Sequence, residues 1–512
     1  MALPYKAIGV NGMGLREHAR SGVMWTGLAV AASAAVQVIR IVILARFFLE
    51  PHDFGLIALA IAVIYIIAGV ADFGTTSSLL HRQDATRAEL SSVFWFNVVL
   101  GFAFCALTVL AAPLLGRLLH EPAVTPLLQA LAVCLVIDGC TAPLLVLLRR
   151  DLQFRRASLA EAISILAGTA VTLVLAVFGL GVWALAIGMI AQTLLRAILV
   201  LRWGWSNFAL GVRLKPADLK GFLAFGAFQT AERLVGRVSD RIGQLLLDAI
   251  AGPVQLGLYS VASNLATMPM LQILPIIGLT ATPILSKTQS DAQRMARGYF
   301  LATEILMTVM APMFLGLLVI APTLVPLLLG DKWTESAPIF QVICLNTLFY
   351  SFYFFSGALI IAKGRGLLGF GWRVGLLLAT IAPAYCGAYY GKALGLASGI
   401  AAVTALAIVP YYLFVLRRLL GPCLGELARA IGIPVAMGAV MATVVAVLGS
   451  TLQGWNSVAT LTIEIATGVL LYAALLLLFR PGIAREIMLV VPFGRIFGLL
   501  GSMRGAWLGR SS

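Results

Sequence analysis

Residues 229–248 (QTAERLVGRVSDRIGQLLLD) place charged and amide side chains at helical spacing inside a long apolar region. At about 100° per residue, one arc of such a helix is polar and the opposite face is apolar. The arc contains Arg233, Arg237, Asp240, Arg241, Gln244 and Asp248, and Gln229 extends it. A guanidinium donates paired hydrogen bonds to phosphate oxygens and stays charged when partly buried. The arc therefore predicts binding of an anionic head group.

The same spacing also allows a structural interpretation. Arg237 could pair with Asp240, or Arg241 with Asp248, so that the arc would simply hold the lobes together. Charged side chains inside a membrane are costly, so they face a partner or a water-filled cavity. Three arginines at i, i+4 and i+8 lie close together, and two aspartates balance only part of their charge. We therefore favour a cavity that keeps positive potential.

A second polar face lies in residues 22–47, where Thr26, Ser33, Gln37 and Arg40 share helical spacing. We expect this face and the arginine-rich face to line one central cavity. The predicted substrate-binding residues are Arg40, Arg233, Arg237, Arg241, Gln37 and Gln244, and the candidates for ion coupling are Asp240 and Asp138. For Asp138, and for the isolated Arg373, an interhelical hydrogen bond is an equally open explanation. The sequence predicts no catalytic residue, metal site or cofactor.

The composition requires that the elements holding these residues span a membrane. The 512 residues are 61% hydrophobic with mean hydropathy +1.00, and 11% are charged, against about 25% in soluble domains. Each spanning helix needs about 20 apolar residues. The sequence predicts an all-α polytopic membrane protein with fourteen transmembrane helices, at 22–47, 54–72, 91–115, 124–148, 157–178, 181–203, 220–249, 256–284, 299–329, 337–361, 367–388, 393–416, 428–449 and 459–479.

Lysine and arginine are distributed unequally between the two sides of these helices. Most of the 36 basic residues fall on the side of the N-terminus, and the opposite side has only Arg46, Arg117, Lys332 and Lys392. Short cytoplasmic loops accumulate Lys and Arg, so we predict that both termini are cytoplasmic. The net charge of +15 is then explained by topology and anionic lipid head groups rather than by nucleic-acid binding.

Two predicted turns are similar in sequence. EPHDFGLIALA at 50–60 resembles GPVQLGLYSVA at 252–262, and Ala112-Pro113 and Ala321-Pro322 follow at similar spacing. This similarity predicts two parallel six-helix repeats with a binding site between them. The predicted organisation is a cytoplasmic N-terminal segment at 1–21, an N-lobe at 22–203, a cytoplasmic amphipathic linker at 204–219, a C-lobe at 220–416, two further helices at 417–479 and a basic amphipathic cytoplasmic tail at 480–512.

Other patterns predict structure rather than chemistry. Five of the six cysteines lie in apolar runs and none forms a CxxC pair, as is typical of small core residues. GRGLLG at 364–369 fits GxGxxG but joins two predicted membrane helices, so it does not indicate dinucleotide binding. Gly391, Gly395 and Gly399 predict close helix packing.

Several motifs together resemble a known family. They are ARxFLxPxxFG at 45–55, LLRRxLxF at 147–154, Asp240 followed by LGLYSVASNLATMP at 256–269, and LGDKW at 329–333. Their order resembles the polysaccharide transporter (Wzx/WzxC-like) branch of the multidrug/oligosaccharidyl-lipid/polysaccharide flippase superfamily. The resemblance implies a non-enzymatic flippase that moves undecaprenyl-diphosphate-linked oligosaccharide across the bacterial inner membrane by alternating access, for lipopolysaccharide or exopolysaccharide synthesis. It also implies membrane lipids, a polysaccharide polymerase and export machinery as partners, and no nucleic acid.

Three other functions fit parts of the sequence. A multidrug or metabolite cation antiporter of the same superfamily would favour a cavity dominated by carboxylates, whereas arginine exceeds acid here. A membrane glycan polymerase or ligase usually has a sizeable outer loop, and the predicted outer loops are short. A flippase for a lipid-II-type cell-wall precursor would share the mechanism and differ in the sugar.

Overall fold

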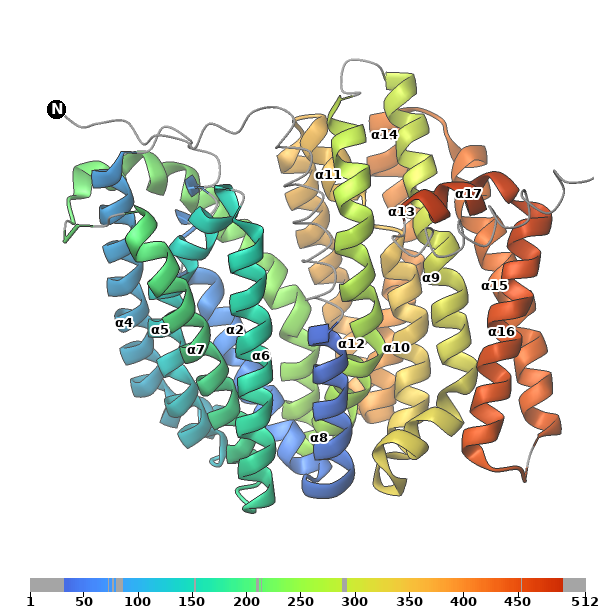
Figure 1. Cartoon of the computed structure of the whole chain (residues 1–512), viewed down its shortest axis with the longest axis horizontal. Helices are drawn as coiled ribbons and strands as arrows, with labels where there is room; N and C mark the ends of the chain where they lie inside the picture. The colour runs from blue at the N-terminus through green and yellow to red at the C-terminus, as the bar shows by residue number, and fades with distance from the viewer. Residues whose placement is uncertain are drawn as a thin grey trace, which may run out of the picture. The chain divides into compact units, whose positions relative to one another are not determined.

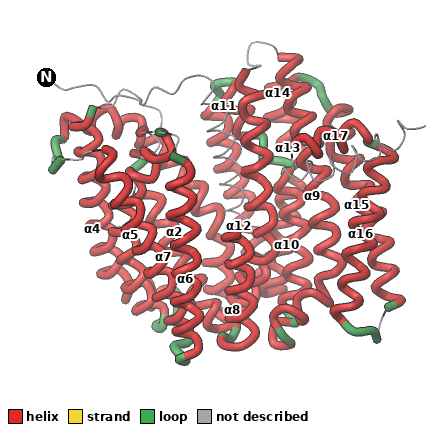
Figure 2. The backbone as a smooth tube through the Cα atoms, viewed as in Figure 1, coloured by secondary structure: helices red, strands yellow, loops and turns green. Residues whose placement is uncertain are grey.

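The computed structural model describes residues 32–71, 73–75, 78–79, 86–151, 153–208, 211–212, 214–287, 292–452 and 454–490. Within these ranges the regular structure is helical and no strand occurs (Figure 2). The elements are η1 (Leu44–Phe48), α2 (Pro51–Ala71), α4 (Arg87–Leu118), α5 (Val124–Arg150), α6 (Phe154–Val177), α7 (Val182–Phe208), α8 (Pro216–Lys287), α9 (Ala292–Leu329), η2 (Asp331–Trp333), α10 (Ser336–Ser351), α11 (Ser356–Ala362), α12 (Gly366–Leu406), α13 (Ile408–Tyr411), η3 (Tyr412–Leu416), α14 (Arg417–Leu420), α15 (Leu424–Thr451), α16 (Ser457–Phe479) and α17 (Pro481–Val490). The predicted all-α fold is confirmed.

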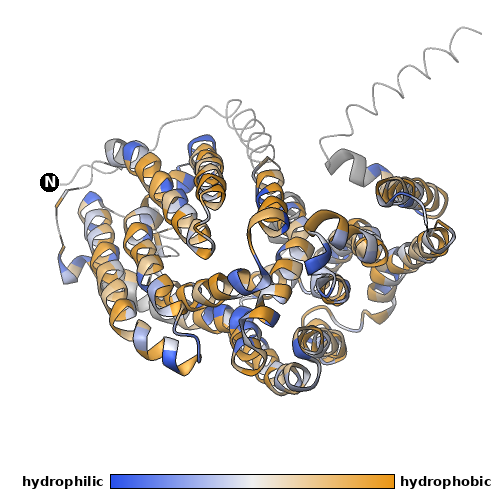
Figure 3. Cartoon of the chain, turned by 90° about the horizontal axis from the view of Figure 1, so that it is seen from below, coloured by the Kyte–Doolittle hydropathy of each residue, from blue (hydrophilic) through white to orange (hydrophobic). Residues whose placement is uncertain are grey.

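Eleven helical stretches in the described part of the chain are long and apolar enough to cross a membrane. Seen nearly end-on, the helices carry hydrophobic residues around most of their circumference (Figure 3). A helix that is apolar on every side belongs in a membrane or in the core of a large protein. The chain is therefore a multi-pass membrane protein.

Two of these stretches each contain two predicted spans. Gly252 interrupts α8 with φ 79°, and Gly391 and Lys392 interrupt α12. Glycine adopts positive φ without the steric penalty of a Cβ, so Gly252 allows the chain to turn back. If each limb is counted, and residues 32–48 are taken as the described part of the first span, the helices match the fourteen predicted spans.

Some helix ends differ from the predicted boundaries. α7 continues to Phe208 and α8 begins at Pro216, so both helices extend into the predicted linker. α2 begins at Pro51, because proline suits the first position of a helix, where its missing N–H has no intrahelical partner to lose. Segment 1–21 lies outside the described residues, and α17 is the described part of the predicted tail.

The glycine-rich face at the end of α12 brings its two limbs into backbone contact. A Cβ on Gly395 would collide with the carbonyl of Gly387, and a Cβ on Gly399 with that of Pro383. The predicted close packing is therefore confirmed for Gly395 and Gly399. The prediction is wrong for Gly391, which has open space around it and belongs to the turn.

The chain divides into two compact units. Unit 1 contains Met1–Leu265, Leu328–Ile339 and Arg373–Gly399, and unit 2 contains Ala266–Leu327, Phe340–Trp372 and Ile400–Ser512. In unit 1, α5 packs against α2, α4 and α7, and α6 packs against α7 (Figure 1). In unit 2, α15 packs against α16, and the Tyr472 hydroxyl fixes α16 to α9 by donating to the Thr308 carbonyl at 2.9 Å. The predicted lobe boundaries stay a prediction.

The two turns that are similar in sequence contact each other within unit 1. A Cβ on Gly55 would collide with the carbonyl of Pro253, and a Cβ on Gly257 with the carbonyl of Pro51. Only a residue without a side chain permits this approach, so each turn has a glycine for the same steric reason. Reciprocal contacts of this kind are expected from a two-fold relation between the turns. The superposition of two six-helix repeats stays a prediction.

The LGDKW segment fastens the end of α9 to the first of these turns. The fully buried Trp333 donates from its indole nitrogen to the Ala45 carbonyl at 3.0 Å and packs edge-on against Phe54. Lys332 donates to the Leu49 carbonyl at 2.8 Å. These bonds satisfy carbonyl groups that the π-helical turn at Leu44–Phe48 leaves open.

Candidate functional site

A cavity of about 330 Å³ lies within unit 1, bounded by α2, α4, α5, α7 and α8. Its lining is mostly aliphatic and small, with the polar members Tyr65, Asn97, Asp138 and Arg237. Small-molecule sites range over about 300–1,000 Å³. The cavity therefore has room for a compact polar group, and a larger ligand would have to extend beyond it.

Tyr65 holds two arginines of α8 side by side. Arg237 donates from Nη1 to the Tyr65 carbonyl at 2.7 Å, and its guanidinium carbon lies 4.5 Å from the Tyr65 ring centroid. The Arg241 guanidinium carbon lies 4.9 Å from the same centroid, and its Nη1 donates to Gln244 Oε1 at 2.9 Å. Gly69 provides space, because a Cβ there would lie 2.7 Å from Arg237 Cδ.

Neither of these guanidinium groups is neutralised by an ion pair with a described residue. Arg237 and Arg241 contact a backbone carbonyl, an amide oxygen and an aromatic face, all of them uncharged. Asp240 is exposed, and the charges of Arg241, Arg373 and Arg237 act on it without a close ion pair. Asp248 has no hydrogen bond on either carboxylate oxygen. The alternative in which Arg237 pairs with Asp240 and Arg241 with Asp248 is therefore wrong for this structure. Both guanidinium groups therefore remain available to an anion.

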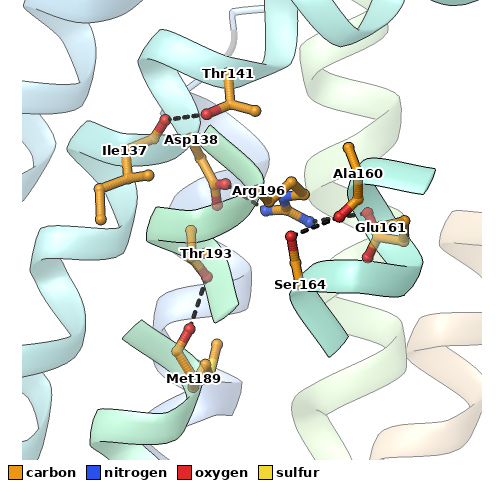
Figure 4. Close-up of polar contacts among 9 residues, drawn as sticks. All are labelled: Ile137, Asp138, Thr141, Ala160, Glu161, Ser164, Met189, Thr193 and Arg196. Carbon is orange, nitrogen blue, oxygen red and sulfur yellow. Dashed lines mark hydrogen bonds and ion pairs between the residues drawn. The ribbon is translucent and has the colours of Figure 1, made fainter. Parts of the chain in front are cut away.

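A second cluster of charged side chains links three helices beside the cavity (Figure 4). Arg196 on α7 donates from Nη2 to Asp138 Oδ1 on α5 at 2.7 Å, and its Nη1 lies 3.6 Å from Glu161 Oε2 on α6. Asp138 therefore makes the interhelical hydrogen bond that was one of its two open explanations. Its side chain is still 44% exposed and lines the cavity, so a second role in ion coupling stays a prediction.

The uncharged polar groups around the cavity find partners locally. The hydroxyls of Thr141, Thr193 and Ser164 each donate to the carbonyl four residues earlier in their own helix (Figure 4). Asn97 donates from Nδ2 to Thr75 Oγ1 at 2.8 Å. These bonds leave Arg237 and Asp138 as the charged groups of the lining, and both keep hydrogen-bonding capacity beyond the bonds described above.

Residues 43–338, more than half of the chain, match the family described as polysaccharide biosynthesis protein. The chain belongs to this family. The matched range includes every residue that lines the cavity. One relative is the lipopolysaccharide biosynthesis protein WzxC of Escherichia coli (strain K12). It is 27% identical to this chain over 446 residues, which cover 86% of this chain and 90% of WzxC. The succinoglycan biosynthesis transport protein ExoT of Rhizobium meliloti (strain 1021) is 24% identical over 469 residues, 91% and 94% of the two chains.

Solved structures with the same fold include two kinds of transporter. The lipid II flippase MurJ in an inward closed conformation superposes with a TM-score of 0.73 at 16% identity, over 89% of this chain and 98% of MurJ. An inward-facing multidrug resistance MATE family transporter of the MOP superfamily superposes with a TM-score of 0.57 at 14% identity, over 76% and 94%. The resemblance to a Wzx-like polysaccharide transporter that the motifs indicated is confirmed.

In this polysaccharide biosynthesis protein, α8 brings together part of the predicted binding set. Arg237, Arg241 and the buried Gln244 meet around Tyr65, and Arg233 is half-buried one turn before Arg237. Gln37 and Arg40 are half-buried on the helical residues 32–43 but do not belong to the lining of the cavity. The binding roles of all these residues stay a prediction.

The partners of the charged residues were not predicted from the sequence. Arg196 lies in the apolar middle of α7, and Asp138 and Glu161 lie in the neighbouring helices α5 and α6. Since each intramembrane charge needs a partner, this cation and these two acids could have been matched. Tyr65 gave no such signal, because it sits in an apolar helix and its role depends on how α8 approaches α2.

Proposed function

We propose that this protein is a flippase that translocates undecaprenyl-diphosphate-linked oligosaccharide across the bacterial inner membrane, by alternating access, for polysaccharide synthesis. Membership of the polysaccharide biosynthesis protein family and the similarity to WzxC and ExoT support a role in glycan assembly. The fold shared with the lipid II flippase MurJ supports a lipid-linked cargo. We also propose that the product passes to a polysaccharide polymerase or export machinery.

The observation that carries the proposal is the pair of guanidinium groups at Tyr65 that form no ion pair with a described residue. Arg237 faces the cavity, and Arg241 lies beside it on the same ring. A diphosphate supplies the missing negative charge and accepts bidentate hydrogen bonds from a guanidinium fork. The cavity of about 330 Å³ accommodates such a head group, and the oligosaccharide and lipid chain extend beyond it.

The same charges disfavour a cationic cargo. A cationic drug would meet Arg237 and Arg241, and Asp138, the acid that lines the cavity, is already bonded to Arg196. Like charges in a site of low dielectric repel strongly. The antiporter function therefore lacks the carboxylate-dominated cavity that it requires.

Reconstitution tests the proposed cargo directly. Purified protein in liposomes is supplied with a fluorescent undecaprenyl-diphosphate oligosaccharide in one leaflet, and translocation is followed with an impermeant quencher. A cationic dye is tested in parallel under the same gradients. Protein-dependent movement of the lipid-linked glycan without dye transport is expected. Dye transport in the absence of lipid translocation would overturn the proposal in favour of the antiporter.

We propose a topology with both termini in the cytoplasm. In a Cys386→Ser background, which removes an exposed native thiol, Asp151→Cys and Lys215→Cys should resist an impermeant maleimide in intact cells and react after permeabilisation. Glu335→Cys, exposed on the predicted outer side, is the matched control and should react in intact cells. Labelling of position 151 or 215 from outside would contradict the topology.

A further inference from the structure

Asp248 is a buried acid without a partner. It lies on α8, one turn before the turn at Gly252, and the residue is only 4% exposed. Both carboxylate oxygens lack a hydrogen-bond partner in the part of the chain that the structure describes. An ionised carboxylate in such a place is unfavourable by several kcal/mol unless hydrogen bonds or a cation compensate it.

No described residue provides that compensation. The charged group that acts on Asp248 most directly is Glu121, in the connection between α4 and α5, and its charge has the same sign. The nearest arginine along α8 is Arg241, two turns earlier, and it is already bonded to Gln244 and placed over Tyr65. A nearby charge of the same sign disfavours ionisation of Asp248. The neutral acid form of Asp248 is therefore the one that fits this conformation.

Asp248 is also the end of a polar line that begins in the cavity. Arg237, Arg241, Gln244 and Asp248 follow one face of α8 at i, i+4, i+7 and i+11. Arg237 lines the cavity, and Gln244, which is 8% exposed, accepts a hydrogen bond from Arg241. Asp248 therefore lies on the same helix face as the two arginines that we propose bind the anion.

We propose that Asp248 is a proton-binding site whose loading and release are coupled to transport. This proposal rests on the proposed function and identifies the proton as the coupling ion. In the conformation seen here the carboxyl keeps its O–H bond. When a conformational change hydrates the site, that bond breaks, the proton passes to water, and the carboxylate remains. The new negative charge then competes with the bound diphosphate for the arginines of α8, which favours release of the cargo.

A pH gradient across reconstituted liposomes tests the coupling. With one proton per cargo, a gradient of one pH unit sustains a roughly tenfold ratio of lipid-linked oligosaccharide between the leaflets. Asp248→Asn should reduce this ratio to about that of the gradient-free control, while exchange without a gradient continues, since the amide cannot release a proton. Asp248→Glu should retain coupling, and Glu335→Gln, an exposed acid, is the matched control. A ratio that still follows the pH gradient in Asp248→Asn, or a wild-type ratio that follows sodium instead, would overturn the proposal.

A second readout does not depend on transport. Infrared spectroscopy of the reconstituted protein without cargo detects the carbonyl stretch of neutral carboxylic acids. At neutral pH, subtraction of the Asp248→Asn spectrum from the wild-type spectrum should leave one such band, and subtraction of the Glu335→Gln spectrum should leave none. Absence of the Asp248 band would refute the proton site even if the protein is a flippase. A band in a protein that moves no lipid-linked glycan would instead refute the proposed function alone.

Discussion

Replacement of Arg237 by alanine tests the anion site most directly, because this guanidinium both faces the cavity and fastens α8 to α2. A hydrogen bond to a charged group contributes about 1.5–3 kcal/mol. If the diphosphate takes one such bond from Arg237, its loss weakens binding by roughly 10- to 150-fold, at about 1.4 kcal/mol per factor of ten. Arg237→Ala should therefore raise the substrate concentration needed for half-maximal translocation by that factor.

Two further variants separate the charge of Arg237 from its geometry. Arg237→Lys should recover only part of the affinity, because an ammonium lacks the planar fork. Gly69→Ala keeps every charge but places a Cβ 2.7 Å from Arg237 Cδ, so it should displace the guanidinium and weaken binding in the same direction. Arg297→Ala removes an exposed arginine at the start of α9 and is the matched control.

The assay is the initial rate of translocation in liposomes at several substrate concentrations, normalised to inserted protein. The melting temperature in detergent is measured for each variant, because Arg237→Ala also removes the cation–π contact with Tyr65, worth about 0.5–2 kcal/mol. An Arg237 variant with a lower melting temperature but the wild-type dependence of translocation rate on substrate concentration would show that Arg237 only holds helices together. That result would refute the anion site.

Two predictions concern the packing of unit 1. Arg196→Ala leaves Asp138 and Glu161 without their shared cation, and should destabilise the fold by about 1–3 kcal/mol, less than for a fully buried pair because both acids are partly exposed; an unchanged melting temperature in detergent would contradict this role. Gly257→Ala forces a Cβ into the Pro51 carbonyl and should cost about 1–3 kcal/mol. The matched control Gly375→Ala, in open space, should be neutral or stabilising by up to about 1 kcal/mol in the same assay, and equal effects at the two glycines would exclude the steric explanation.

The sequence by itself determined the class of fold and the face on which the arginines lie. Long apolar runs specify membrane helices, because a backbone in lipid must satisfy its hydrogen bonds within the helix. Helical periodicity placed Arg237, Arg241 and Gln244 on one side of α8, and they meet there. The close approach at Gly395 and Gly399 was also predicted from their spacing, whereas Gly391 belongs to the turn.

Only the tertiary structure decided what those side chains contact. Arg196 and Asp138 lie 58 residues apart, and Arg237 and the Tyr65 carbonyl 172 residues apart. Periodicity assigns a residue to a face of its own helix, but it does not specify which helix that face contacts or at what depth along the helix axis. Steric packing determines the partner helix and the depth, through glycines such as Gly69 and Gly257 that let backbones or long side chains approach. The partners of the charges follow from that packing, because an intramembrane charge bonds to whatever the neighbouring helix presents at its own depth.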